Sequence, residues 1–136
     1  MAIWQYTFLL LPKRSIKDAS SPLVKDDNGF DDSAFWKLSP TTREAFYGVS
    51  DFLKANKSWS NSIDQYGDID SNCVEVYFEN ETVESVSFRL NYTINYEYVL
   101  TEMFDFCVRG EFVLLDENLE VRALSTFHAS HLGKAS

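Results

Sequence analysis

Glycine, proline and cysteine are all scarce in this chain of 136 residues, which contains five, three and two of them. Two cysteines cannot form a disulfide framework, and the scattered glycines form no Gly-rich loop for binding phosphate. No apolar run approaches the roughly 20 residues that a membrane-spanning helix needs. Apolar residues nevertheless make up 45% of the chain and aromatic residues 15%, which excludes bulk disorder. The length fits a single domain covering residues 1–136.

Positive charge is also in short supply, with 12 Lys and Arg residues against 21 Asp and Glu residues and a net charge of -9. Such an excess repels phosphate backbones and therefore argues against a nucleic-acid partner. It favours a basic protein partner, although an acidic surface also serves solubility alone. The N-terminus has no basic segment before its apolar stretch, so we expect no secretion signal, no membrane partner and a cytoplasmic location.

The order of expected elements is strand, helix, strand, strand, helix, strand. Alternation and capping patterns predict strands at 2–11, 73–79, 83–92 and 111–116 and helices at 39–55 and 95–109. This order predicts an α+β, ferredoxin-like βαββαβ fold: a four-stranded antiparallel sheet with two helices on one face. The strands at 2–11 and 83–92 would then lie in the interior of the sheet.

Two segments fall outside this pattern. Residues 13–38 form an irregular region that is too long for an ordinary connection, so they are either a functional loop or contain an undetected element. Residues 125–136 read as a C-terminal tail, and residues 119–124 could pair back onto the last strand.

The hairpin at 73–92 has an apolar face formed by its even-numbered residues. Residues that pair directly share a face, and this requirement predicts a three-residue loop at 80–82. Glu84 falls on the apolar side, which a β-bulge or exposure at the tip would allow.

The outward face of this hairpin mixes aromatic and acidic side chains, as a protein interface for a basic partner would. The alternative is an ordinary solvated sheet face. The candidate partner-binding residues on this face and in the loops around it are Glu75, Tyr77, Glu79, Glu81, Glu84, Tyr66, Asp68 and Asp70.

The run from Asp68 through Asp70 to Asn72 places oxygen ligands at alternate positions, as calcium loops do. Cys73 stands where such a loop needs glycine, and a strand starting there would carry Glu79 away from the other ligands. We therefore expect no metal site here.

His128 and His131 are three residues apart but lack further ligands for zinc. Cys73 and Cys107 lie in apolar patterns typical of core thiols and not of nucleophiles. We expect neither a catalytic residue nor a cofactor.

In size, charge and layout the chain resembles the small acidic immunity proteins of bacterial contact-dependent and polymorphic toxin systems. No motif carries this resemblance, so it transfers no residue's role. It implies a non-enzymatic inhibitor that neutralises a cognate basic toxin by masking its active site. The alternatives are a ferredoxin-like module for ligand binding or homodimerisation, and a small enzyme with an acidic pocket lined by Trp4, Trp36 or Trp59.

Overall fold

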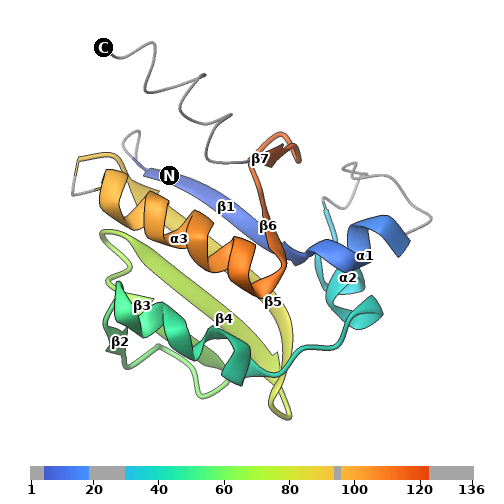
Figure 1. Ribbon diagram of the computed structural model, residues 1–136. Helices are drawn as coiled ribbons and strands as arrows, with labels where there is room; N and C mark the ends of the chain where they lie inside the picture. Colours follow the sequence, from blue (N-terminus) through green and yellow to red (C-terminus); the bar gives the residue numbers. More distant parts are fainter. Residues whose placement is uncertain (1–4, 19–29, 94–95, 123–136) are drawn as a thin grey trace.

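The computed structural model describes residues 5–18, 30–93 and 96–122, and within them one antiparallel sheet forms the centre of the molecule (Figure 1). Seven strands lie in the order β2-β3-β4-β5-β1-β6-β7. Their bounds are β1 Gln5–Pro12, β2 Ala55–Asn56, β3 Ile63–Gly67, β4 Cys73–Glu79, β5 Thr82–Asn91, β6 Phe112–Leu115 and β7 Val121–Arg122. The helices are α1 Lys13–Asp18, α2 Ser33–Leu38, the 3-10 helix η1 Arg43–Asp51, and α3 Tyr96–Gly110.

The expected ferredoxin-like fold is wrong. The sheet has more than four strands, and α3 is the one long α-helix among the described residues. The expected strands at 2–11 and 83–92 do lie in the interior, because β1 pairs with β5 and β6, and β5 pairs with β4 and β1. Residues 119–124 contribute β7, which pairs with β6 as their pattern allowed.

The α-helix expected at 39–55 is replaced by the shorter η1 for a structural reason. The chain just before η1 is tied to the β4–β5 turn, since Val83 N–H donates to the Thr41 carbonyl (2.8 Å) and Arg43 N–H donates to the Glu81 carbonyl (2.9 Å). This extended stretch prevents Ser39 and Pro40 from starting a helix. Phe46 and Val49 still face the core, at 0% exposure.

Two further segments contain elements that their patterns did not reveal. Residues 56–71, which read as turns, contribute β3 and one residue of β2. The irregular region 13–38 contains α1 and α2. Phe35 and Trp36 of α2 are buried in the core, whereas Leu38 is 54% exposed.

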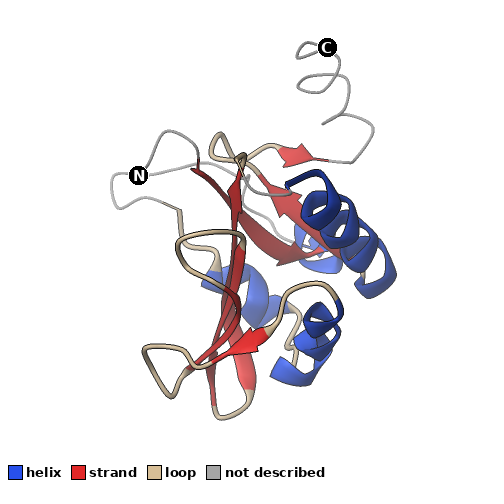
Figure 2. Ribbon diagram, turned by 90° about the vertical axis from the view of Figure 1, so that its left-hand side faces the viewer, coloured by secondary structure: helices blue, strands red, loops and turns tan. Residues whose placement is uncertain are grey.

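The main core lies between one face of the sheet and the helices α3 and η1, which run side by side over that face (Figures 1 and 2). The strands contribute mostly even-numbered residues to this core, and the buried apolar residues along one side of α3 pack on them. In the described part of the chain, no helix covers the opposite face of β3 and β4 (Figure 2). This open face includes the outward side chains of the hairpin.

The turn between β4 and β5 differs from the expected three-residue loop. Glu79 pairs with Thr82, so Asn80 and Glu81 form a two-residue turn, both with positive φ (50° and 68°). Tyr77 pairs with Ser85 while the next pair is Phe78 with Val83, which leaves Glu84 as the extra residue of a β-bulge. The bulge keeps the apolar face continuous and turns the Glu84 carboxylate outward. Of the two explanations expected for Glu84, the β-bulge is thus confirmed.

Gly67→Ala tests the tight end of β3. Gly67 has a φ of +83°, and an added Cβ would lie 2.1 Å from the Asn72 carbonyl oxygen. We expect the substitution to lower the free energy of unfolding by roughly 2 kcal/mol or more through strain and steric conflict. Urea denaturation measures this change. Gly48→Ala is the matched control, because its Cβ would meet nothing closer than 3.6 Å, and it should change the free energy far less. Equal losses in the two variants would contradict the prediction.

Candidate functional site

The open sheet face carries an exposed tryptophan held by a buried carboxylate. Glu75 projects from β4 between the core residues Val74 and Val76, hence to the opposite face, yet it is only 6% exposed. Its Oε2 accepts a hydrogen bond from Nε1 of Trp59, at 3.0 Å. Trp59 lies in the loop between β2 and β3 and is 71% exposed. The carboxylate therefore fixes the orientation of a large ring at the surface.

Polar and aromatic neighbours complete this part of the face. Glu75 lies between Gln65 of β3 and Ser87 of β5 in the strand register. Burial raises the pKa of the Tyr77 phenol, and the nearby Glu75 carboxylate raises it further. Arg89 lowers that pKa and donates a hydrogen bond to the Ile69 carbonyl, at 3.0 Å.

Both cysteines are unsuited to nucleophilic chemistry. Burial raises the pKa of the Cys73 thiol to about 12, with a further contribution from Glu75. Burial alone raises the pKa of the Cys107 thiol. A thiol must ionise to act as a nucleophile, so both remain protonated near neutral pH. The structure thus agrees with their interpretation as core thiols.

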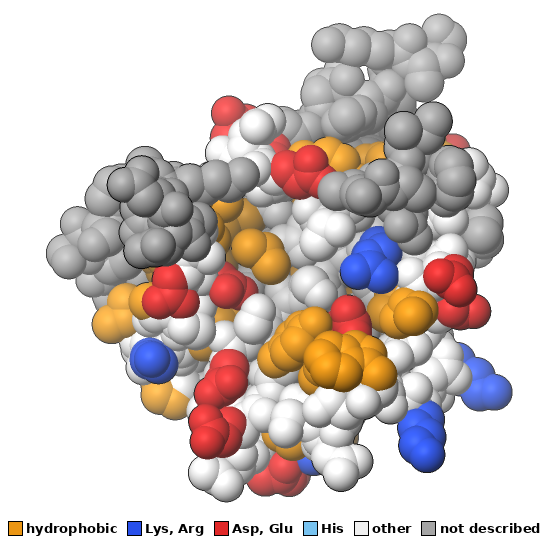
Figure 3. Space-filling model, turned by 180° about the vertical axis from the view of Figure 1, so that it is seen from behind, with side chains coloured by type: hydrophobic (Ala, Val, Ile, Leu, Met, Phe, Trp, Pro, Cys, Tyr) orange, Lys and Arg blue, Asp and Glu red, His pale blue; other side chains and the backbone are white. Residues whose placement is uncertain are grey.

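Seen from behind, this face shows an apolar group near its middle with acidic side chains on both sides of it, and Lys and Arg side chains lie close to the group and toward one edge (Figure 3). The β3–β4 loop brings exposed Asp68 and Asp70 close to β4, and exposed Glu79 and Glu84 lie in β4 and β5 on either side of the β4–β5 turn. Apolar and charged side chains therefore lie together on the open face.

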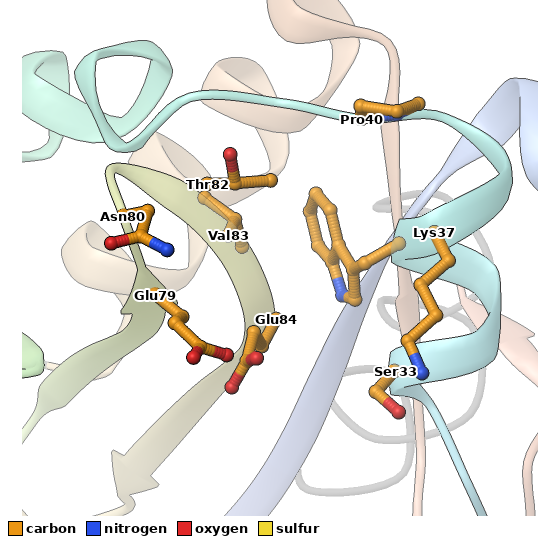
Figure 4. Close-up of a pocket in the computed structure, with 9 residues that line it drawn as sticks. Ser33, Lys37, Pro40, Glu79, Asn80, Thr82, Val83 and Glu84 are labelled. Carbon is orange, nitrogen blue, oxygen red and sulfur yellow. The ribbon is translucent and has the colours of Figure 1, made fainter.

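A pocket of about 460 Å³ lies at one end of the sheet, between α2 and the β4–β5 turn (Figure 4). This volume falls within the range of roughly 300–1,000 Å³ that is usual for ligand sites. The pocket combines carboxylates, a lysine, hydroxyl groups and an indole. Its lining residues are Ser33, Trp36, Lys37, Pro40, Glu79, Asn80, Thr82, Val83 and Glu84.

Two carboxylates face each other in this pocket. The side chains of Glu79 and Glu84 point toward one another, while Lys37 and Ser33 lie on the opposite wall (Figure 4). The hydrogen bond with Glu79 is the main cause that raises the pKa of Glu84, followed by burial and by the repulsion between the two charges; Lys37 lowers it. Glu84 therefore holds a proton more readily than an isolated carboxyl does.

The indole of Trp36 forms another wall of the pocket and has an unmet hydrogen-bonding need. Trp36 is 1% exposed, and its Nε1 has no hydrogen-bond partner among the described residues. Its ring packs against Phe46 and Phe112, which offer no acceptor. A buried indole N–H normally finds a partner, so this group is an exception to that rule.

The structure separates the residues proposed as partner-binding. Tyr66 is 4% exposed and faces the core, and burial raises its pKa to about 12, so neither it nor buried Glu75 offers a free surface side chain. Glu81 is exposed but forms an ion pair with Arg43, at 2.9 Å. Tyr77 is partly buried on the open face. The exposed acids of the proposed set that form no ion pair with a described residue are Glu79, Glu84, Asp68 and Asp70.

The possible calcium loop is a closed turn. Asp68 Oδ1 accepts a hydrogen bond from the Asp70 N–H (3.2 Å), and buried Asn72 accepts one from the Asn91 N–H (2.7 Å). The described residues contain no group of three or more His, Cys, Asp or Glu side chains that could hold a metal ion. His128 and His131 lie outside the described residues.

Sequence reasoning did not assign Trp59, Trp36 and Lys37 to an interface. Trp59 stands in a serine-rich polar stretch where no apolar pattern buries it, and this isolation was a usable signal. Trp36 sits beside Phe35 and looks like a core residue, which it also is. The position of Lys37 across the pocket from the hairpin tip depends on tertiary structure alone.

No family model matches the chain, and neither curated proteins nor solved structures show a significant match to it. Among the described residues, no helix has both the length and the apolar character required to cross a membrane.

A double-mutant cycle tests the link between Trp59 and Glu75. Trp59→Phe and Glu75→Ala each remove one side of the hydrogen bond, and we expect a coupling free energy of about 1 kcal/mol from urea denaturation. Pairing Trp59→Phe with Glu79→Ala is the control and should be additive. A cycle with no coupling between Trp59 and Glu75 would mean that the carboxylate does not fix the ring.

The Glu79–Glu84 pair predicts a pH effect. A carboxyl whose pKa is raised on folding stabilises the folded state below the pKa of the unfolded chain and loses that stabilisation as pH rises through the folded pKa. Glu84→Gln should therefore be more stable than the wild type at neutral pH, and this gain should disappear in acid. Unfolding curves from pH 3 to pH 8 measure it. Glu120→Gln, at an exposed position away from the pair, should show no comparable pH-dependent gain.

Proposed function

We propose that this chain is a protein-binding inhibitor of the immunity-protein type, which docks the open face of β3, β4 and β5 on a basic toxin domain and masks its active site. The observation that carries the proposal is the exposed Trp59 ring, oriented by the buried carboxylate of Glu75. The resemblance in size and charge supports the choice of an inhibitor.

Tryptophan is among the residues that contribute most to protein interfaces, because it buries a large area with few rotatable bonds. Here the hydrogen bond to Glu75 already restricts the ring before a partner arrives. Less side-chain freedom is then lost on binding, which favours affinity. Tyr77, partly buried on the same face of β4, extends the aromatic surface.

The charge distribution supports a basic partner. The net charge is -9, and the open face is flanked by acidic side chains (Figure 3). Arg43 forms ion pairs with both Asp64 and Glu81, whereas Asp68 and Asp70 form no ion pair with a described residue. Uncompensated rim charges accelerate encounter with an opposite charge and lose this effect at high salt.

The test uses the purified basic proteins encoded beside the gene for this chain, measured by titration calorimetry and by inhibition of their activity. We expect one of them to form a 1:1 complex that weakens with salt and to lose its activity in that complex. Trp59→Ala should weaken binding at least 100-fold, mainly through faster release. Tyr98→Ala is the matched control, since Tyr98 is a 48% exposed aromatic residue on α3, away from the open face.

The proposal fails if no neighbouring basic protein binds, or if Trp59→Ala binds as tightly as Tyr98→Ala. It also fails if the chain alone forms a dimer that Trp59→Ala dissociates, because the open face would then be a self-association surface. Sedimentation measurements over a range of concentrations decide this last point.

A further inference from the structure

We propose that the pocket between α2 and the β4–β5 turn receives one arginine side chain of the basic partner, with its guanidinium group bound by Glu79 and Glu84. This inference rests on the proposed function, because it assumes that the partner is a protein. It assigns the pocket a ligand chemistry and distinguishes it from the Trp59 surface.

The first argument is the position of the two carboxylates. Their side chains converge on the same space, which forces two like charges together at the mouth of the pocket (Figure 4). Lys37, the cation that lowers the pKa of Glu84, stands on the opposite wall of the pocket, so the space between the two carboxylates holds no cationic side chain of a described residue. A cationic group placed between them would remove their repulsion and could hydrogen-bond both.

The second argument is the indole of Trp36, which is independent of the acidic pair. Its buried N–H has no acceptor among the described residues, Trp36 lines the pocket, and the rings that pack against it, Phe46 and Phe112, offer no acceptor. A peptide segment brings carbonyl oxygens together with its cationic side chain. The same residue of a partner thus supplies both the cation for Glu79 and Glu84 and an acceptor for the indole.

Arginine fits this pocket better than the other cations. Its planar guanidinium has five N–H donors and can bind two carboxylates at once, and it stacks on aromatic rings, whereas lysine acts as a point charge. A divalent metal would need a larger set of oxygen ligands. The described residues contain no group of three or more His, Cys, Asp or Glu side chains that could hold one.

The direct experiment titrates the protein with N-acetyl-arginine amide, which carries one arginine side chain and two peptide carbonyls, and follows it by NMR. We expect millimolar binding that shifts the Trp36 indole N–H and the Glu84 carboxyl signals. N-acetyl-citrulline amide has nearly the same shape without the charge and should not bind. N-acetyl-lysine amide should bind at least threefold more weakly than the arginine probe.

Two matched double variants separate the pocket from general acidity. Glu79→Gln with Glu84→Gln should abolish the probe-induced shifts, whereas Asp68→Asn with Asp70→Asn changes the net charge equally and should leave them unchanged. Both pairs are exposed, so the variants should fold, and this is checked by their NMR spectra. Unchanged shifts in the first variant, or equal losses in both, would overturn the proposal. So would tighter binding of free agmatine than of the capped arginine, because the pocket would then serve a small amine.

The outcome does not depend on finding the partner. If the arginine probe binds as expected but no basic protein forms a complex, the proposed function fails while the pocket's chemistry stands. If a complex forms but the Glu79→Gln, Glu84→Gln variant binds the partner as tightly as the Asp68→Asn, Asp70→Asn variant, the pocket proposal fails and the inhibitor proposal stands. When both hold, we expect the first variant to weaken the complex at least tenfold more than the second.

Discussion

The antiparallel pairing of β1 with β5 lies in the middle of the sheet and joins its two halves, β2-β3-β4-β5 and β1-β6-β7. Its register runs from Gln5 opposite Asn91 to Leu10 opposite Val86. The facing pair Phe8 and Phe88 stacks with ring centroids 5.8 Å apart, inside the core that α3 covers. Because β5 also pairs with β4, this register determines which side chains of the hairpin face the helices and which face outward.

The parts of the fold that follow from local patterns could be predicted. The alternation of β4 and β5, the stripe of α3 and the apolar character of β1 each reflect burial within one element. The prediction of a ferredoxin-like architecture was wrong because it depended on an α-helix at 39–55. Tertiary hydrogen bonds to the β4–β5 turn hold the start of this segment extended, and η1 forms in place of the α-helix. β3 escaped detection since its apolar residues, Ile63 and Tyr66, lie three apart and face opposite sides of the sheet.

The candidate site, like the fold, has features that could be predicted from the sequence and features that could not. The bulge at Glu84 was foreseeable because a charged residue interrupts an apolar face, and the structure places it there. The burial of Glu75 was not foreseeable from its strand, since it depends on Trp59, which is 16 residues earlier in the chain. The facing of Glu79 and Glu84 also needs the bulge and the tight turn together. Contacts between side chains that depend on loops or on irregular strand pairing cannot be predicted from the periodicity of the sequence.

The outermost strand β2 has a consequence for solution behaviour. It contributes only Ala55 and Asn56 to the ladder, and exposed Lys54 and Lys57 stand on either side of it. A long, flat, uncharged edge strand would offer free backbone groups to a neighbouring chain and seed fibrils. The edge strand β2 is only two residues long and lies between two lysines. A strand of another molecule therefore has few backbone groups to pair with at this edge, even in a concentrated solution.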